Sequence, residues 1–222
     1  MKITGRLVDA SNATMLATIE DGADGIKVIY KPVAGERPLW DFPHGTLADR
    51  EYAAYLLSSL GGFHVVPFTV LREGPFGPGA VQQWIEIDPE VDLIEFFQKK
   101  LSALRKMALF DAVINNTDRK IGHILPTREG LVYGCDHGVT FHEEDKLRTV
   151  LWQWAGKSLH DEERELLGIV SRALDSELGD ALGVLLIESE INALKRRTNR
   201  LLENNLFPEP TQDWPSVPWP PF

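Results

Sequence analysis

The first third of the chain alternates apolar and polar positions with the two-residue period of β-strands. The segments 14–20 and 26–31 are rich in β-branched residues and flank a loop of Asp, Gly and Ala at 21–25. This pattern is typical of a β-hairpin. Residues 6–10 predict a further strand, separated from the hairpin by a tight turn at Ser11 and Asn12.

A helix is predicted next, followed by more strands. Leu and Ala recur at helical spacing over 47–60, and Gly61 and Gly62 follow as a helix stop. Thr46, with Asp49 three residues later, predicts a capping box at the start of this helix. Strands are predicted at 65–71 and 80–87, with a Gly- and Pro-rich loop at 73–79 between them.

From residue 93 onward the pattern is mainly helical. Residues 101–114 carry apolar side chains on two faces, which predicts a buried helix. Two short strands at 124–125 and 131–135 are predicted around a turn, and helices are predicted at 159–174 and 177–206. The last fifteen residues contain six prolines and two tryptophans, so we expect an extended tail. This order of elements predicts an α+β fold.

Composition narrows the classes of protein. The 222 residues fit one domain or one small two-lobed unit. The single cysteine excludes a disulfide framework and any multi-cysteine zinc site. The apolar runs are too short to span a membrane, and the N-terminus has no apolar core like that of a secretory signal, so we expect a cytoplasmic protein. A net charge of −10 argues against nucleic acid or a lipid surface as a partner.

The segment that carries chemistry begins directly after the helix predicted at 101–114. A polar loop there contains Asp118 and His123, and the far end of the predicted short hairpin carries Asp136 close to Gly138. Two carboxylates and one imidazole can converge at this place. Oxygen ligands with one nitrogen suit Mg²⁺ or Mn²⁺.

These residues resemble the motifs of the kinase fold in its atypical branch, which contains the phosphatidylinositol 3- and 4-kinases and the HipA-type kinases. The lipid kinases have a catalytic loop D-R-H-x-x-N, a hairpin, and then D-F-G. Asp118-Arg119 match D-R, Lys120 stands in place of the His, and His123 occupies the position of the Asn, five residues after Asp118. Asp136-His137-Gly138 stand for D-F-G, eighteen residues after Asp118. The chain is similar to small actinobacterial proteins related to phosphatidylinositol kinases.

The resemblance implies a two-lobed kinase-like fold. A small β-rich lobe would comprise residues 1–86, a helical lobe 87–207, and the proline-rich tail 208–222. The resemblance covers about residues 5–140 and implies ATP and Mg²⁺ or Mn²⁺ as cofactors.

The resemblance also implies a role for each matching residue. Asp118 would orient the acceptor or take its proton, while His123 and Asp136 would hold metal ions. Lys31, at the end of the second hairpin strand, would bind phosphate, with Glu51 on the first helix as its ion-pair partner.

Two further segments would complete a nucleotide site. Ser11 and Asn12 would present backbone N–H groups and a hydroxyl to the phosphates. Gln83, Trp84 and Ile85 would belong to the hinge between the lobes, where backbone groups meet an adenine ring and Trp84 flanks it.

Each of these residues also has a simpler explanation. Lys31 can end a strand at the surface, Glu51 can be a solvated helix residue, Asp118 and Asp136 can be turn formers, and His123 can be structural. We predict an ATP- and metal-dependent phosphotransferase. The alternatives are a pseudokinase, which the Lys120 and His123 departures favour, a nucleotidyl transferase on the same fold, and, more weakly, a metal-dependent hydrolase.

We expect the acceptor to be a protein side chain or a soluble small molecule. A kinase that acts on membrane phosphoinositides works at an anionic surface, where basic residues supply attraction. Residues 142–148 follow Asp136, where an acceptor would dock by analogy, and carry three acidic and two basic residues. The sequence therefore offers no polybasic segment for an inositol phosphate.

Overall fold

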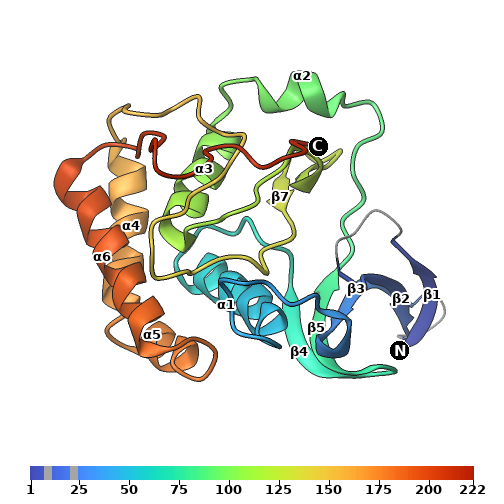
Figure 1. The fold of residues 1–222 in the computed structure, drawn as a ribbon. Coiled ribbons are helices and arrows are strands. Elements are labelled where there is room, and N and C mark those ends of the chain that lie inside the picture. The colour runs from blue at the N-terminus through green and yellow to red at the C-terminus, as the bar shows by residue number, and fades with distance from the viewer. Residues whose placement is uncertain (8–11, 21–24) are drawn as a thin grey trace.

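The computed structural model describes residues 1–7, 12–20 and 25–222. The chain is a mixed α/β protein whose N-terminal region is an antiparallel sheet and whose C-terminal part is helical (Figure 1). Neighbouring strands of the five-stranded sheet follow the order β1-β2-β3-β5-β4 and all pair antiparallel. The strands are β1 (Lys2–Arg6), β2 (Met15–Ile19), β3 (Ile26–Pro32), β4 (Thr69–Gly74) and β5 (Gly77–Gln83).

One helix packs against both the sheet and the helical part. Helix α1 (Leu47–Leu60) lies between β3 and β4 in the sequence and follows a short 3-10 helix, η1 (Val33–Gly35). Its inner face buries Ala53, Ala54 and Leu57 in the large core, and Gly61 and Gly62 end it as the sequence predicts. Because α1 belongs to both parts, its side chains can reach a strand on one side and the later loops on the other.

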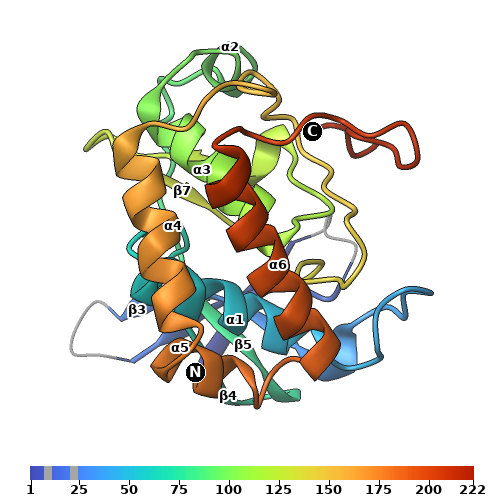
Figure 2. The ribbon, with the colours of Figure 1, turned by 90° about the vertical axis from the view of Figure 1, so that its left-hand side faces the viewer.

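The C-terminal part is built around a buried central helix. Helix α3 (Ser102–Ile114) buries nine of its residues, as its two apolar faces predict. Helices α4 and α6 pack side by side (Figure 2). The remaining elements are α2 (Leu93–Phe97), η2 (Ile121–His123), β6 (Ile124–Pro126), β7 (Val132–Gly134), α4 (Asp161–Ala173), α5 (Glu177–Leu182) and α6 (Glu188–Asn204).

The proline-rich tail returns over the helical part instead of leaving it. Residues 208–222 form no helix or strand, and the tail ends near the β6–β7 hairpin (Figure 1). The amide of Ile121 donates to the carbonyl of Pro221 at 2.8 Å, and the amide of Thr149 donates to that of Ser216 at 3.0 Å. The tail is therefore bonded to segments that precede it by about 70 to 100 residues.

The structure corrects two sequence predictions in the N-terminal part and places a third element earlier. Strand β1 covers residues 2–6, where it pairs with β2; it shares Arg6 with the strand predicted at 6–10, and residues 8–10 lie outside the described part. The strand predicted at 65–71 begins only at Thr69. Pro67 has no N–H to donate to a neighbouring strand, and the amides of Val65 and Val66 donate to the hydroxyl of Ser58 instead. The loop predicted at 73–79 is a tight hairpin in which Gly74 pairs with Gly77.

Two further corrections concern helices. Thr46 makes no capping bond, and its hydroxyl donates to Pro43 instead. The carboxylate of Glu36 accepts from the amides of Leu47 and Ala48 at 3.2 and 2.9 Å and so caps α1 from eleven residues upstream. The helix predicted over 177–206 is two helices, α5 and α6, separated by residues 183–187.

Among the described residues, no helix is long and apolar enough to cross a membrane.

Candidate active site

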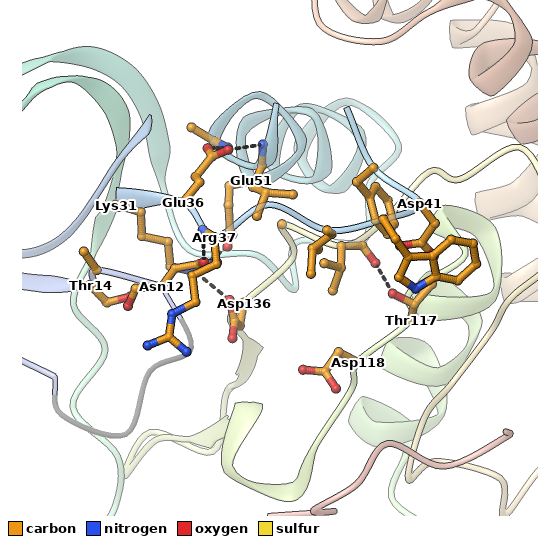
Figure 3. A pocket seen from close by; sticks show the side chains of 18 of the residues that line it. Asn12, Thr14, Lys31, Glu36, Arg37, Asp41, Glu51, Thr117, Asp118 and Asp136 are labelled. Atoms are coloured by element: carbon orange, nitrogen blue, oxygen red, sulfur yellow. Dashed lines mark hydrogen bonds and ion pairs between the residues drawn. The ribbon is translucent and has the colours of Figure 1, made fainter. Parts of the chain in front are cut away.

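The lysine predicted to bind phosphate lies on a central strand of the sheet. β3 pairs with β2 on one side and β5 on the other, which fixes the position of Lys31 opposite Ala80. The Lys31 ammonium donates to Glu51 and, at 2.9 Å, to Oδ1 of Asp136 (Figure 3). Burial opposes its charged form, but Asp136 and Glu51 outweigh this and raise the pKa of Lys31 above its ordinary value. Lys31 is therefore a positive charge held between two carboxylates.

Glu51 is fixed by its helix. Its side chain is buried, and burial raises the pKa of the carboxyl despite the opposing effect of Lys31. The preceding residue, Arg50, bonds Glu190 on α6 at 2.5 Å and the carbonyl of Thr140 at 2.7 Å. A Cβ at Gly138 would lie 3.3 Å from that of Leu47 and 3.6 Å from Oε1 of Glu51. Glycine at 138 therefore lets the segment after Asp136 approach α1.

Asp136 follows β7 in the left-handed region, with φ of 61°. Its side chain is about half exposed, and the charge of Lys31 is the main cause that lowers the pKa of the carboxyl far below its usual range. Nε2 of His123 lies 3.4 Å from Oδ2 of Asp136. Burial lowers the pKa of His123 to about 4, so its imidazole is neutral at neutral pH.

Asp118 lies in a loop whose shape is set by α3. Asn115 ends the helix in the left-handed region, with φ of 53°. The Asn116 side chain donates to Asp111 at 2.9 Å and accepts the amide of Asp118 at 3.0 Å. The Asp118 carboxyl stays partly exposed, and desolvation raises its pKa although Lys120, 3.6 Å away, opposes the shift. The loop backbone is thus fastened to α3 while Asp118 faces the cavity.

Arg119 connects the Asp118 loop to the turn at Asp136 through hydrogen bonds of its side chain. Its guanidinium is fully buried, bonds Asp111 at 2.9 Å, and donates to the carbonyl of Cys135 at 2.9 Å. It also donates to Nε2 of His137 at 2.7 Å. His137 occupies the position after Asp136 and packs edge-on against Phe110. The arginine of the D-R pair therefore positions both acidic segments relative to each other.

Two cavities meet at Lys31 and Asp136. One, of about 400 Å³, is lined by residues that include Gln83, Trp84, Ile85, His123 and Cys135. The other, of about 350 Å³, contains Asn12, Glu51 and Asp118 (Figure 3). Thr14, Lys31 and Asp136 line both. A ligand in the first cavity and a ligand in the second would therefore meet at the same pair of charges.

The structure thus brings most of the predicted site residues together. Ser11 lies outside the described residues, whereas Asn12 lines the second cavity and its side chain accepts the amide of Arg37 at 2.8 Å. The amides of Gln83 and Trp84 donate to the carbonyls of Phe68 and Lys27, so neither is free to donate to a ring in the first cavity.

Sequence reasoning overlooked three residues that help to form this site. Asp111 appeared only as a position of a buried helix, and its charge partner lies eight residues later in a loop. Arg148 and Trp214 line the second cavity but lie 30 and 96 residues after Asp118. For Asp111, the one available signal is an acidic residue inside an otherwise apolar stretch, because a buried acid requires a partner.

The donor set fits a divalent cation that arrives with phosphates. Among the described residues, no three His, Cys, Asp or Glu side chains gather closely enough to enclose a metal. Mg²⁺ in phosphoryl-transfer sites is commonly held by one or two carboxylates and completed by phosphate and water. An ionised, partly exposed Asp136 beside a neutral imidazole at 123 supplies such an incomplete set.

Sequence comparison identifies relatives of this chain. No family model matches it. The chain is 42% identical over 257 residues to Protein Rv2133c of Mycobacterium tuberculosis (strain ATCC 25618 / H37Rv), across 100% of this chain and 92% of the relative. The chain belongs to the family of Protein Rv2133c.

Structural comparison shows the class of fold. The crystal structure of the Helicobacter pylori proinflammatory kinase CtkA matches with a TM-score of 0.52 and 10% sequence identity. The match covers 92% of this chain and 91% of CtkA. The chain therefore has a kinase-like fold. The narrower resemblance to the phosphatidylinositol 3-/4-kinase and HipA-type branch stays a prediction.

Proposed function

We propose that this protein is an ATP- and divalent-metal-dependent phosphotransferase with two lobes, whose acceptor is a protein side chain or a soluble small molecule. The observation that carries the proposal is the simultaneous contact of Lys31 with Glu51 and Asp136. These residues come from the sheet, from α1 and from the turn after β7, and they meet where the two cavities join. The kinase-like fold supports this reading.

The two cavities divide the substrates between them. The first cavity is mainly apolar and lies between β5 and the β6–β7 hairpin, which suits a nucleotide base. Phosphates of that nucleotide would reach the Lys31 ammonium, a point charge suited to phosphate oxygens. The second cavity, with Asp118 in its wall, would then receive the acceptor.

Each residue has a stated task in the reaction. Lys31 binds and orients the transferred phosphate, and Glu51 holds Lys31 in place. Asp118 orients the acceptor hydroxyl or takes its proton, a role favoured by its partial exposure and raised pKa. His123 and Asp136 would hold Mg²⁺ or Mn²⁺, which neutralises developing charge on the phosphates. Phosphoryl transfer needs this positioning and charge stabilisation more than covalent chemistry.

Nucleotide binding is the first test. Calorimetry with a non-hydrolysable ATP analogue, with and without Mn²⁺, should show binding that Lys31→Met weakens at least tenfold. Lys27→Met is the matched control, because Lys27 lies on the same strand but is largely exposed and pairs with Glu86. Failure of the wild-type protein to bind at millimolar analogue, with or without Mn²⁺, would rule out the proposal.

A pseudokinase is the second candidate, favoured by Lys120 and His123 at positions where the lipid kinases have other residues. ATP labelled at the γ-phosphate separates the two candidates. Transfer of label that disappears in Asp118→Asn, while nucleotide binding persists, supports the phosphotransferase. Binding without any transfer supports the pseudokinase, and label transferred only from α-labelled ATP indicates a nucleotidyl transferase.

A further inference from the structure

The second cavity contains two buried N–H donors that lack an acceptor. Nε of Arg148 and Nε1 of Trp214 are both inaccessible to solvent and have no hydrogen-bond partner among the described residues. Both side chains line this cavity, which also holds Asp118. Buried polar groups are rarely left unpaired in folded proteins, so two unpaired donors in one cavity point to a ligand rich in acceptor atoms.

Arg148 is held beside Asp118 by its own backbone. Its amide donates to the carbonyl of Asn116 at 2.9 Å, and its carbonyl accepts the amide of Arg119 at 3.1 Å. These two bonds lie on either side of Asp118, and the charge of Arg148 lowers the pKa of Asp118 against the larger effect of burial. The guanidinium forms no ion pair with any described residue.

Trp214 belongs to the proline-rich tail and reaches the cavity from there. The carbonyl of Ser216, two residues later, accepts from the amide of Thr149 at 3.0 Å and from the indole of Trp152 at 2.9 Å. The Trp214 ring lies 5.0 Å from the ammonium of Lys146, which is also 4.8 Å from the ring of Trp40. The tail therefore joins the Arg148 segment, and the buried lysine between two indoles holds Trp214 in place.

Two of the three basic residues that line this cavity, Arg37 and Arg148, have no ion-pair partner among the described residues. Its acidic residues other than Asp118 are already engaged: Glu36 caps α1, Asp41 pairs with Lys146, and Glu51 and Asp136 pair with Lys31. Arg37 is exposed and also lines this cavity (Figure 3), and like Arg148 it has no ion-pair partner among the described residues. Arginine guanidinium groups bind carboxylate and phosphate strongly.

We propose that the acceptor carries an anionic group, a carboxylate or a phosphate, which binds in the second cavity to the guanidinium of Arg148 and the indole N–H of Trp214. That the bound anion belongs to a phosphoryl acceptor rests on the proposed function, whereas the existence of the anion site does not. The tail is then part of the acceptor site, and Arg37 adds charge at its entrance.

The nucleotide's own phosphate is a second source of the same chemistry. Neither Arg148 nor Trp214 lines the first cavity, and of the residues that the structure describes the two cavities share only Thr14, Lys31 and Asp136. The unpaired donors are thus on the Asp118 side of the shared residues. This placement favours the acceptor over the nucleotide as the source of the anion.

Indole N–H resonances test the proposal without any enzymatic assay. The full chain is labelled with ¹⁵N, and the Trp214 cross-peak is the one missing from Trp214→Phe. Trp219→Phe, a change at the largely exposed tryptophan of the same tail, is the control. Malonate and inorganic phosphate are titrated as probes, first without nucleotide and then with a saturating Mg²⁺ complex of the ATP analogue.

We expect a saturable shift of the Trp214 cross-peak with at least one probe, in both conditions. Arg148→Gln and Arg148→Lys should weaken the probe affinity at least tenfold, while Arg128→Gln, at an exposed arginine in the β6–β7 turn, should not change it. Unchanged shifts of the other indoles confirm that each variant is folded.

Three results would overturn the proposal. These are the absence of a saturable shift with both probes, an affinity that Arg148→Gln leaves unchanged, and loss of the shift once nucleotide is bound. The last result would assign the two donors to the nucleotide's phosphates. If the nucleotide does not bind at all, the proposed function fails, yet a saturable, Arg148-dependent shift still establishes the anion site.

Discussion

The thiol of Cys135 should react far more slowly than an ordinary cysteine. It is the single cysteine of the chain, it precedes Asp136, and it lines the first cavity. Burial, with Asp136 as a further cause, raises the pKa of the Cys135 thiol to about 12. Because the thiolate is the nucleophile, the rate of alkylation follows the fraction of thiol that is ionised.

The size of the effect follows from the two pKa values. At pH 8 a thiol with a pKa of about 8.5 is roughly one-quarter ionised, whereas a pKa of about 12 leaves about one in 10⁴ ionised. The ionised fraction thus falls on the order of 10³-fold, and the greater nucleophilicity of a high-pKa thiolate recovers part of this, so the native protein should react with iodoacetamide on the order of 10² times more slowly than the same chain unfolded in urea. Its rate should also keep rising about tenfold per pH unit up to pH 10, where an ordinary thiol has levelled off.

Mass spectrometry of the alkylated protein measures both quantities, with Cys135→Ser as the blank. Levelling of the native rate near pH 9, or a rate at pH 8 within tenfold of that of the unfolded chain, would refute the reasoning. Addition of the ATP analogue provides a separate readout, because a ligand in the first cavity should shield the thiol and slow alkylation further.

Three more predictions concern stability, each measured by urea unfolding followed by tryptophan fluorescence. Asp111→Asn should lower the free energy of unfolding by about 3–5 kcal/mol, because it leaves the buried Arg119 charge without its partner; a loss below about 1 kcal/mol would contradict this. The folded pKa of His123, about 4, lies below its unfolded value, so the unfolded state takes up the extra proton and stability should fall as the pH drops from 6.5 toward 4. His123 should contribute about 2 kcal/mol of this loss at pH 5, so the loss should be smaller by about that amount in His123→Asn; the buried His137, whose pKa is also lowered, causes a loss that remains in the variant. Glu36→Ala should cost about 1 kcal/mol through the lost cap of α1 and Thr46→Ala clearly less, and the reverse order would restore Thr46 as the cap.

The sequence predicts those helices and strands that are determined by residues within or directly beside the element itself. The bounds of α1 follow from apolar spacing and from the two glycines after Leu60, and the hairpin of β2 and β3 follows from alternation. The cap of α1 was predicted wrongly because the carboxylate that provides it lies eleven residues upstream, at Glu36. No pattern of spacing within a helix encodes a contact of that kind.

In the candidate site, too, contacts between residues distant in sequence are the ones that the sequence pattern does not predict. Lys31 and Asp136 are 105 residues apart, and only the resemblance to kinases suggested that they meet. The sequence marks Arg148 only as one of the two basic residues in the segment 142–148. Its importance comes from the pairing of its backbone with the Asp118 loop, which depends on the folded chain.

The two sides of the site are held by different means. The Lys31 side rests on a sheet in which β3 is paired along both edges. The Asp118 loop has no such sheet, and its amides and carbonyls instead bond residues 148–150, which in turn bond the tail. Since Ser216 accepts from Thr149 and Pro221 accepts from Ile121, the tail brackets the loop on both sides. The tail therefore supports, together with α3, the segment that carries Asp118, although neither its composition nor its extended form predicts a role in the site.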